Sequence, residues 1–141
     1  IYTELTKKAE YLAKGIQQIL ESKSIPHTIN QVGSMLSVHF SDRPVTDFDS
    51  AKNAAGETFN KFFHHLLENG IYLPPSAYET WFLTDSLVDS DLEKVLEVVK
   101  GFKIWEWLKN WISSSDTLKK LVLMLYMISQ RLQYLSKKEK V

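Results

Sequence analysis

Along the first hundred residues, the spacing of apolar side chains switches repeatedly between a helical and a strand-like period. This alternation limits the possible folds more than any other feature, because each period fits only one kind of element. The opening stretch shows the helical period, with intervals of four and three residues, in Leu5, Ala9, Leu12, Ile16 and Ile19. We predict an amphipathic helix that ends near Lys23, because Pro26 lacks an N–H and restrains the residue before it.

Two further helices are expected from the same period. Apolar side chains of residues 59–67 follow it, and Asn69 and Gly70 then end the helix, since both tolerate a left-handed backbone. Ser90 and Glu93 have the spacing of a capping box and stand just before a third apolar stripe. The third helix is therefore expected to begin at Ser90.

Strand-like patterns fill the intervals between these helices. Residues 27–32 are rich in β-branched side chains, and residues 36–40 alternate apolar with polar. We predict that they pair as a hairpin, with Gly33 in the turn or a bulge. Two more short strands are expected at residues 71–73 and 81–83.

Residues 41–55 lack either period and are rich in turn-forming side chains, which predicts an irregular surface segment. The order over residues 1–101 is then helix, strand, strand, helix, strand, strand, helix. This order is typical of an α+β fold, with a small, mostly antiparallel sheet and helices on one face.

Composition changes at Gly101, which is a candidate boundary. Residues 1–101 carry 9 basic and 14 acidic side chains, whereas residues 102–141 carry 8 basic and 3 acidic ones. The later segment shows only helical spacing, and its run LVLMLYMI is apolar on all sides. We therefore expect a domain over residues 1–101 and an all-helical extension over residues 102–141.

Several classes of function are disfavoured by what the sequence lacks. The formal net charge is zero, which gives no global reason to expect nucleic acid as a partner. Cysteine is absent, so disulfides and thiol catalysis are excluded. There is no glycine-rich phosphate loop and no histidine-based metal motif, and adjacent His64 and His65 point in different directions on a helix. We expect no metal site and no catalytic residue, and His39 is expected to face away from the apolar side of its strand.

The segment from Gly70 to Glu79 is the strongest candidate for a functional loop. A short strand runs into Pro74 and Pro75, and then into Ser76 and the carboxylate of Glu79. Prolines stiffen a loop, and binding residues often lie on such loops. On local chemistry alone, a rigid turn with a solvated Glu79 is the favoured interpretation.

Residues 25–101 resemble the C-terminal domain of glutamate-1-semialdehyde 2,1-aminomutase, a pyridoxal-phosphate enzyme of tetrapyrrole synthesis. The matching stretches are Ile25–Pro26, Asn30–Met35, Phe40–Asp42, Phe62–Phe63, Leu67–Gly70, Tyr72–Glu79 and Asp91–Glu93. Their order and spacing agree, and the leading helix fits as well. The resemblance implies the small-domain fold of fold-type-I aminotransferases.

The resemblance also implies an activity for a larger parent protein. Family members form 5-aminolevulinate by moving an amino group within glutamate-1-semialdehyde, using pyridoxal phosphate, as cytoplasmic homodimers. Their C-terminal domain closes one side of the active-site cleft, which makes Ser76 and Glu79 the candidate residues near substrate. The Schiff-base lysine and the phosphate-binding loops belong to a large domain that these residues lack. This chain alone is therefore expected to be inactive and to bind no cofactor.

Two departures from the family pattern leave other functions open. Ser86 and Leu87 stand where the family often has Ala-His, and residues 102–141 extend beyond the usual end. One alternative is a non-catalytic interaction or oligomerisation module that uses the tail with Trp105, Trp107 and Trp111. Attachment of that tail to a membrane surface is a weaker alternative, and no apolar run approaches the roughly 18 residues of a membrane span.

Overall fold

The computed structural model describes residues 1–104, 121, 124–129 and 131–132. The chain divides into two compact units, Ile1–Phe102 and Lys103–Val141. The first unit contains most of the elements that the alternating apolar periods predict, and it holds the candidate loop. We describe each unit by itself.

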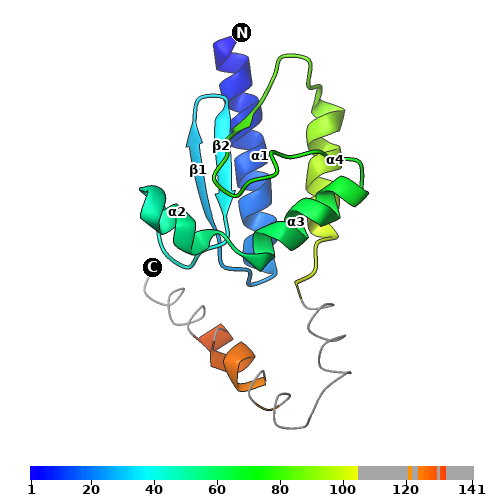
Figure 1. Cartoon of the computed structure of the whole chain (residues 1–141). Helices are drawn as coiled ribbons and strands as arrows, with labels where there is room; N and C mark the ends of the chain where they lie inside the picture. The colour runs from blue at the N-terminus through cyan, green and yellow to red at the C-terminus, as the bar shows by residue number, and fades with distance from the viewer. Residues whose placement is uncertain (105–120, 122–123, 130, 133–141) are drawn as a thin grey trace. The chain divides into compact units, whose positions relative to one another are not determined.

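The sheet of the first unit has three antiparallel strands in the order β1-β2-β3 (Figure 1). The strands are β1 (Thr28–Val32), β2 (Met35–His39) and β3 (Trp81–Phe82). The pairing of Val32 with Met35 closes the predicted hairpin, and Gly33 in its turn has a φ of +57°. Glycine suits this position because side chains disfavour a left-handed backbone. The hairpin prediction is confirmed.

Helices cover one face of this sheet. Helix α1 (Tyr2–Ser22) packs on β1 and β2, and α4 (Asp89–Lys100) packs against α1 (Figure 1). The two helices approach closely at Gly15, where an added Cβ would lie 2.6 Å from a methyl group of Leu96. Helix α3 (Glu57–Glu68) contacts α4, and the two are tied by a hydrogen bond of 2.8 Å between His65 Nε2 and the Val98 carbonyl.

The core lies between the sheet and these helices. Its largest fully buried side chains are Phe62, Ile16, Leu20, Leu36, Leu66 and Val99. An aromatic cluster forms its centre, in which the Phe62 ring lies 5.1 Å from Phe102 and 6.4 Å from Trp81. Phe102 thus belongs to the core of the first unit.

The expected irregular segment at residues 41–55 contains a helix, so that prediction is wrong in part. Helix α2 (Phe48–Ala54) has seven residues. Its N-cap is Asp47, whose carboxylate accepts hydrogen bonds from the backbone N and the hydroxyl of Ser50, both 2.7 Å long. These bonds lower the pKa of Asp47, because they favour the charged carboxylate. Only Ala54 of α2 is buried, so no apolar period revealed the helix.

Two finer predictions are also wrong. Residues 71–73 form no strand, because the Ile71 N–H is taken up by the Leu66 carbonyl in the turn that ends α3. Helix α4 begins at Asp89, and its N-cap residue is Val88. The Val88 backbone N–H donates to the Asp91 carboxylate at 3.0 Å. Glu93 instead accepts a hydrogen bond from the Tyr11 hydroxyl of α1.

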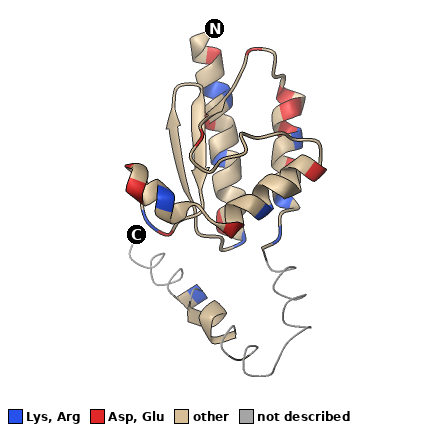
Figure 2. Cartoon of the chain, viewed as in Figure 1, with Lys and Arg blue, Asp and Glu red and all other residues tan. Residues whose placement is uncertain are grey.

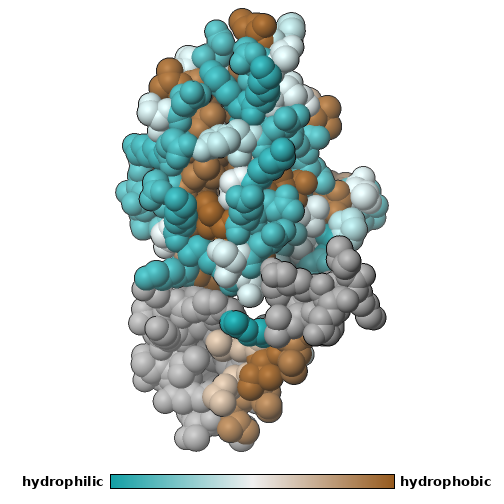
Figure 3. Space-filling model, turned by 180° about the vertical axis from the view of Figure 1, so that it is seen from behind, coloured by the Kyte–Doolittle hydropathy of each residue, from teal (hydrophilic) through white to brown (hydrophobic). Residues whose placement is uncertain are grey.

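The second unit is helical at residues 121, 124–129 and 131–132. Exposed hydrophobic side chains gather on this helix (Figure 3), namely Leu121, Met124, Leu125, Tyr126, Ile128 and Leu132. Across the described part of the chain, no helix has the length and apolar character needed to cross a membrane. The three tryptophans on which the interaction and membrane alternatives rest lie outside the described residues.

Candidate functional site

The candidate loop, residues 71–80, connects α3 to β3 and is anchored at both ends. Gly70 ends α3 with a φ of +80°, and the Ile71 N–H donates to the Leu66 carbonyl at 2.9 Å. Beyond this turn, Leu73 is buried in the core, and at the other end Trp81 is buried. The residues between these two anchors run along the surface, where their side chains are accessible.

The loop brings Ser76 and Glu79 together in one tight turn. The backbone N–H of Glu79 donates to the Ser76 carbonyl at 3.1 Å, and the Ser76 N–H donates to Glu79 Oε2 at 3.3 Å. The Ser76 hydroxyl oxygen accepts from the Tyr78 N–H at 3.2 Å. Serine often closes turns in this way. The structure therefore places the two predicted site residues side by side.

Two contacts connect this turn to other elements. The Tyr78 ring stacks on Phe48 at the beginning of α2, with 5.5 Å between ring centroids. The Thr80 hydroxyl accepts a hydrogen bond of 3.3 Å from Ser37 of β2. Phe48 was not expected as a neighbour of the turn, because the helix that carries it was not predicted.

The turn offers acceptors and one hydroxyl, but no assembled catalytic group. Glu79 is exposed, and its carboxylate can accept further hydrogen bonds or act on charged molecules nearby. Among the described residues, neither Ser76 nor Glu79 hydrogen-bonds to a histidine or a lysine. An activated nucleophile needs such a base within reach. The turn can therefore shape and polarise a cleft, and it holds no nucleophile paired with a base.

The described histidines have other surroundings. His64 is exposed, whereas His65 bonds to α4 and His27 bonds to the Ile25 carbonyl at 2.8 Å. His39 lies on the strand face opposite Leu36, as alternation predicts, yet it is buried. This burial lowers the pKa of His39, because the charged imidazolium loses solvation. Among the described residues, no group of three or more histidine and acidic side chains could hold a metal ion.

The segment that departs from the family pattern packs against α1. The hydroxyls of Thr84 and Ser86 are hydrogen-bonded at 2.8 Å, and the Leu87 carbonyl accepts from Lys8 Nζ at 2.6 Å. Acidic side chains follow at the beginning of α4 (Figure 2). Negative charge is favourable there because of the helix dipole. We therefore assign these acidic side chains a stabilising role.

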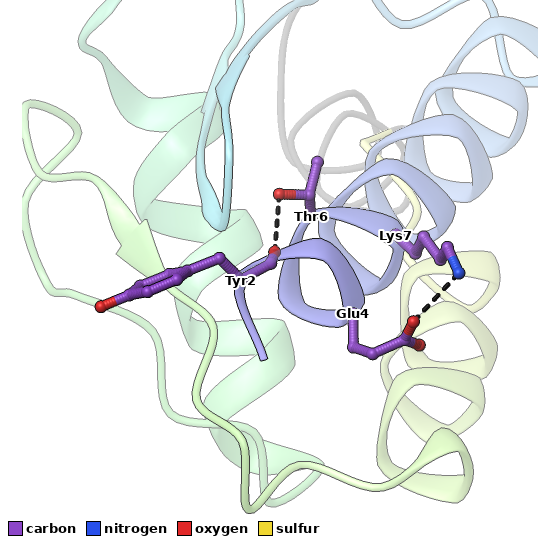
Figure 4. A network of polar contacts seen from close by, with 4 residues as sticks. All are labelled: Tyr2, Glu4, Thr6 and Lys7. Atoms are coloured by element: carbon purple, nitrogen blue, oxygen red, sulfur yellow. Dashed lines mark hydrogen bonds and ion pairs between the residues drawn. The ribbon is translucent and has the colours of Figure 1, made fainter.

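Polar contacts at the beginning of α1 are local to that helix (Figure 4). Lys7 and Glu4 form an ion pair of 3.0 Å, which lowers the pKa of Glu4 through the hydrogen bond and the charge of Lys7. The Thr6 hydroxyl donates to the Tyr2 carbonyl at 2.9 Å. Both contacts span three or four residues of an exposed helix and stabilise it modestly. They form no second site.

Comparison with curated proteins finds relatives that share one name, although no family model matches the chain. A glutamate-1-semialdehyde 2,1-aminomutase of Flavobacterium psychrophilum is 52% identical over 99 residues, which cover 70% of this chain. The aminomutase of Aquifex aeolicus is 48% identical over 103 residues. The matched parts make up only 23% and 24% of those two proteins, so the chain spans about a quarter of their length.

Solved structures support the same fold. A glutamate-1-semialdehyde aminomutase of Pseudomonas aeruginosa, a variant in complex with PMP, has a TM-score of 0.62 at 18% identity, over 71% of this chain and 22% of that one. A β-phenylalanine aminotransferase of Variovorax paradoxus has a TM-score of 0.59 at 23% identity, over 70% and 23% of the two chains. At these identities the likeness concerns the fold, which is that of a small region of aminotransferases.

These findings confirm the predicted α+β class with its small antiparallel sheet and the predicted family resemblance. They give no support to the alternative of a non-catalytic interaction module. The identity of 52% to an aminomutase holds over 99 residues, which is more than two thirds of this chain. The chain is thus similar, over 70% of its length, to glutamate-1-semialdehyde 2,1-aminomutases, of which it spans about a quarter.

Proposed function

We propose that residues 1–101 act as the C-terminal domain of a glutamate-1-semialdehyde 2,1-aminomutase, which forms 5-aminolevulinate for tetrapyrrole synthesis. The observation that carries this proposal is the 52% identity over 99 residues to a curated aminomutase. Ser76 and Glu79 lie on an accessible, anchored turn, which is the arrangement expected of a cleft wall. Residues 103–141 form a separate helical extension in this proposal.

The cofactor of such an enzyme is pyridoxal phosphate, and the described residues do not fit it. The backbone N–H groups of Ser76, Tyr78 and Glu79 are hydrogen-bonded within the turn, so they form no cradle for a phosphate. Lys8 lies on the surface of α1 and bonds to the Leu87 carbonyl. A separate large domain would have to hold the cofactor. We therefore assign no chemical step to this chain alone.

Glu79 would contribute electrostatics to the cleft. Its exposed carboxylate repels anions and attracts ammonium groups, and glutamate-1-semialdehyde carries both kinds of charge. The Ser76 hydroxyl accepts one hydrogen bond from Tyr78 and keeps its own proton available for a donor bond. Together the two side chains could orient a small zwitterion within a closed cleft.

A chimera tests this proposal. The matched 99 residues of the Flavobacterium psychrophilum aminomutase would be replaced by residues 1–101 of this chain, and 5-aminolevulinate formation would be measured. We expect activity from the chimera and none from this chain alone. Glu79→Gln in the chimera should change kcat and leave the thermal stability nearly unchanged. The exposed Glu68→Gln should change neither quantity. A folded chimera without activity would contradict the proposal.

Assembly and location are part of the same proposal. We propose a cytoplasmic homodimer, because the resemblance implies both. Sedimentation equilibrium of the active chimera would measure its mass, and a monomeric active species would refute the dimer. Labelling of the full chain in its source cells would test the location.

A further inference from the structure

One aromatic ring outside the Ser76–Glu79 turn is in contact with it. Within the turn, the hydrogen bonds join Ser76, Tyr78 and Glu79 only to one another. Among the hydrogen bonds, ion pairs and ring contacts of the described residues, only the stack of Tyr78 on Phe48 joins residues 76–79 to another element. The two rings lie at 26° to each other, with 5.5 Å between their centroids. A separation of this size is favourable for an aromatic pair.

The backbone that carries Phe48 is held firmly, although the ring itself is exposed. Phe48 is the first residue of α2 and follows Asp47, whose carboxylate caps that helix. The chain just before α2 is tied to β1, because the Asn30 side chain donates to the Val45 carbonyl at 2.8 Å. Phe48 is 68% exposed, and among the described aromatic rings it contacts only Tyr78. The sheet and the helix cap together therefore fix the place where this ring meets the turn.

The stability of α2 gives no reason for an aromatic ring at this position. Only Ala54 of the helix is buried, so the Phe48 side chain adds little to the core. The beginning of an exposed helix favours acidic or small polar side chains, and Phe has a lower helix propensity than Ala. The contact with Tyr78 is thus the feature of the described structure that accounts for the ring.

We propose that Phe48 is a positioning residue of the aminomutase site, a claim that rests on the proposed function. Tyr78 lies between Ser76 and Glu79 in the chain, and its N–H donates to the Ser76 hydroxyl oxygen at 3.2 Å. When Phe48 holds the Tyr78 ring, it fixes the backbone from which both candidate side chains project. Such placement controls rate, since a displacement of about 1 Å can cost about a hundredfold. Phe48 acts through the turn and has no chemical role of its own.

A first experiment measures the contact in the full 141-residue chain. Hydrogen exchange of the Tyr78 and Glu79 amides, which are bonded within the turn, would be followed by NMR in the unmodified chain and in variants. We expect Phe48→Ala to speed this exchange about three- to tenfold, because the turn opens more often without the aromatic pair. Phe48→Tyr should keep most of the protection. Asn53→Ala truncates an exposed side chain of the same helix and is the matched control.

A second experiment measures the effect on activity in the chimera described above. We expect Phe48→Ala to lower kcat about tenfold with little change in KM, because the turn loses its placement and keeps its charge. Phe48→Tyr should restore kcat, and Asn53→Ala should leave it unchanged. In a chimera that carries Glu79→Gln, Phe48→Ala should lower kcat little further, because the two changes act through one turn. Thermal unfolding of each variant would verify that the fold is kept.

The outcomes separate the role of Phe48 from the proposed function. Unchanged amide exchange in Phe48→Ala would show that the ring does not hold the turn, and it would overturn this inference alone. An active chimera whose kcat is unaffected by Phe48→Ala would also overturn it and leave the proposed function standing. Equal losses of kcat with and without Glu79→Gln would place the effect of Phe48 elsewhere and overturn its positioning role. A folded but inactive chimera would overturn the proposed function and, with it, the role of Phe48.

Discussion

At the scale of single residues, Gly15 shows how closely α1 and α4 pack. An added Cβ would lie 2.6 and 2.7 Å from the two Leu96 methyl groups, and Leu96 is itself buried. We expect Gly15→Val to destabilise the protein by about 2 kcal/mol, because overpacking forces the helices apart. Lys14→Val introduces the same side chain at an exposed neighbour and should cost far less. Urea unfolding followed by circular dichroism would compare the two, and equal stabilities would contradict the close contact.

His39 should make stability depend on pH. Burial lowers its pKa below the ordinary 6.5, so the unfolded chain binds the proton more tightly than the folded one. The contribution is fully present above pH 6.5 and is lost as the pH falls toward the folded-state pKa. We expect His39→Gln to flatten this part of the stability profile, whereas the exposed His64→Gln should not. Thermal unfolding between pH 5 and pH 8 would measure it.

Site residues could be chosen from the sequence only in part. Ser76 and Glu79 were predicted because the loop carries a family pattern, and the structure joins them in one turn. The stacking of Phe48 on Tyr78 could not be predicted, because it joins residues from different elements. Such contacts depend on the folded arrangement and leave no local period in the sequence.

At the scale of elements, the Asp47 cap accounts for the unpredicted helix α2. With only Ala54 buried, α2 depends on its capping bonds more than on packing. We expect Asp47→Ala to lower the hydrogen-exchange protection of the Ala51 and Ala55 amides several-fold, while Asp47→Asn keeps most of it, since both Asp and Asn cap helices. Unchanged protection in Asp47→Ala would refute the role of the cap.

The elements that were predicted correctly are those whose sequence pattern lies within one continuous stretch of the chain. The hairpin was recognised because alternation and a glycine turn lie within a short stretch, and α1 because its apolar stripe is long. The strand at residues 71–73 was wrong because a strand needs a partner, and its sequence carries no information on which edge is free. The prediction of a capping box at Ser90 was wrong because Glu93 bonds to Tyr11 of α1, a helix that lies far from it in the sequence.

At the scale of the whole molecule, Phe102 marks where the first unit ends. It is 2% exposed and packs on Phe62 in the aromatic cluster. We expect a chain of residues 1–102 to fold, and a chain of residues 1–101 to be less stable by about 3 kcal/mol, as for removal of a buried aromatic side chain. Thermal and urea unfolding of the two fragments would measure this difference. Equal stability would show that Phe102 contributes nothing to the core.

The contacts between α1 and α4 have a consequence for how the domain is made on a ribosome. Lys8 bonds to a carbonyl 79 residues later, and Tyr11 bonds to a side chain 82 residues later. Synthesis of that interval takes roughly 4–16 s. During this time α4 is not yet available to cover the apolar stripe of α1. Helix α4 therefore completes the first unit, and a nascent chain arrested before α4 would expose apolar surface that chaperones bind.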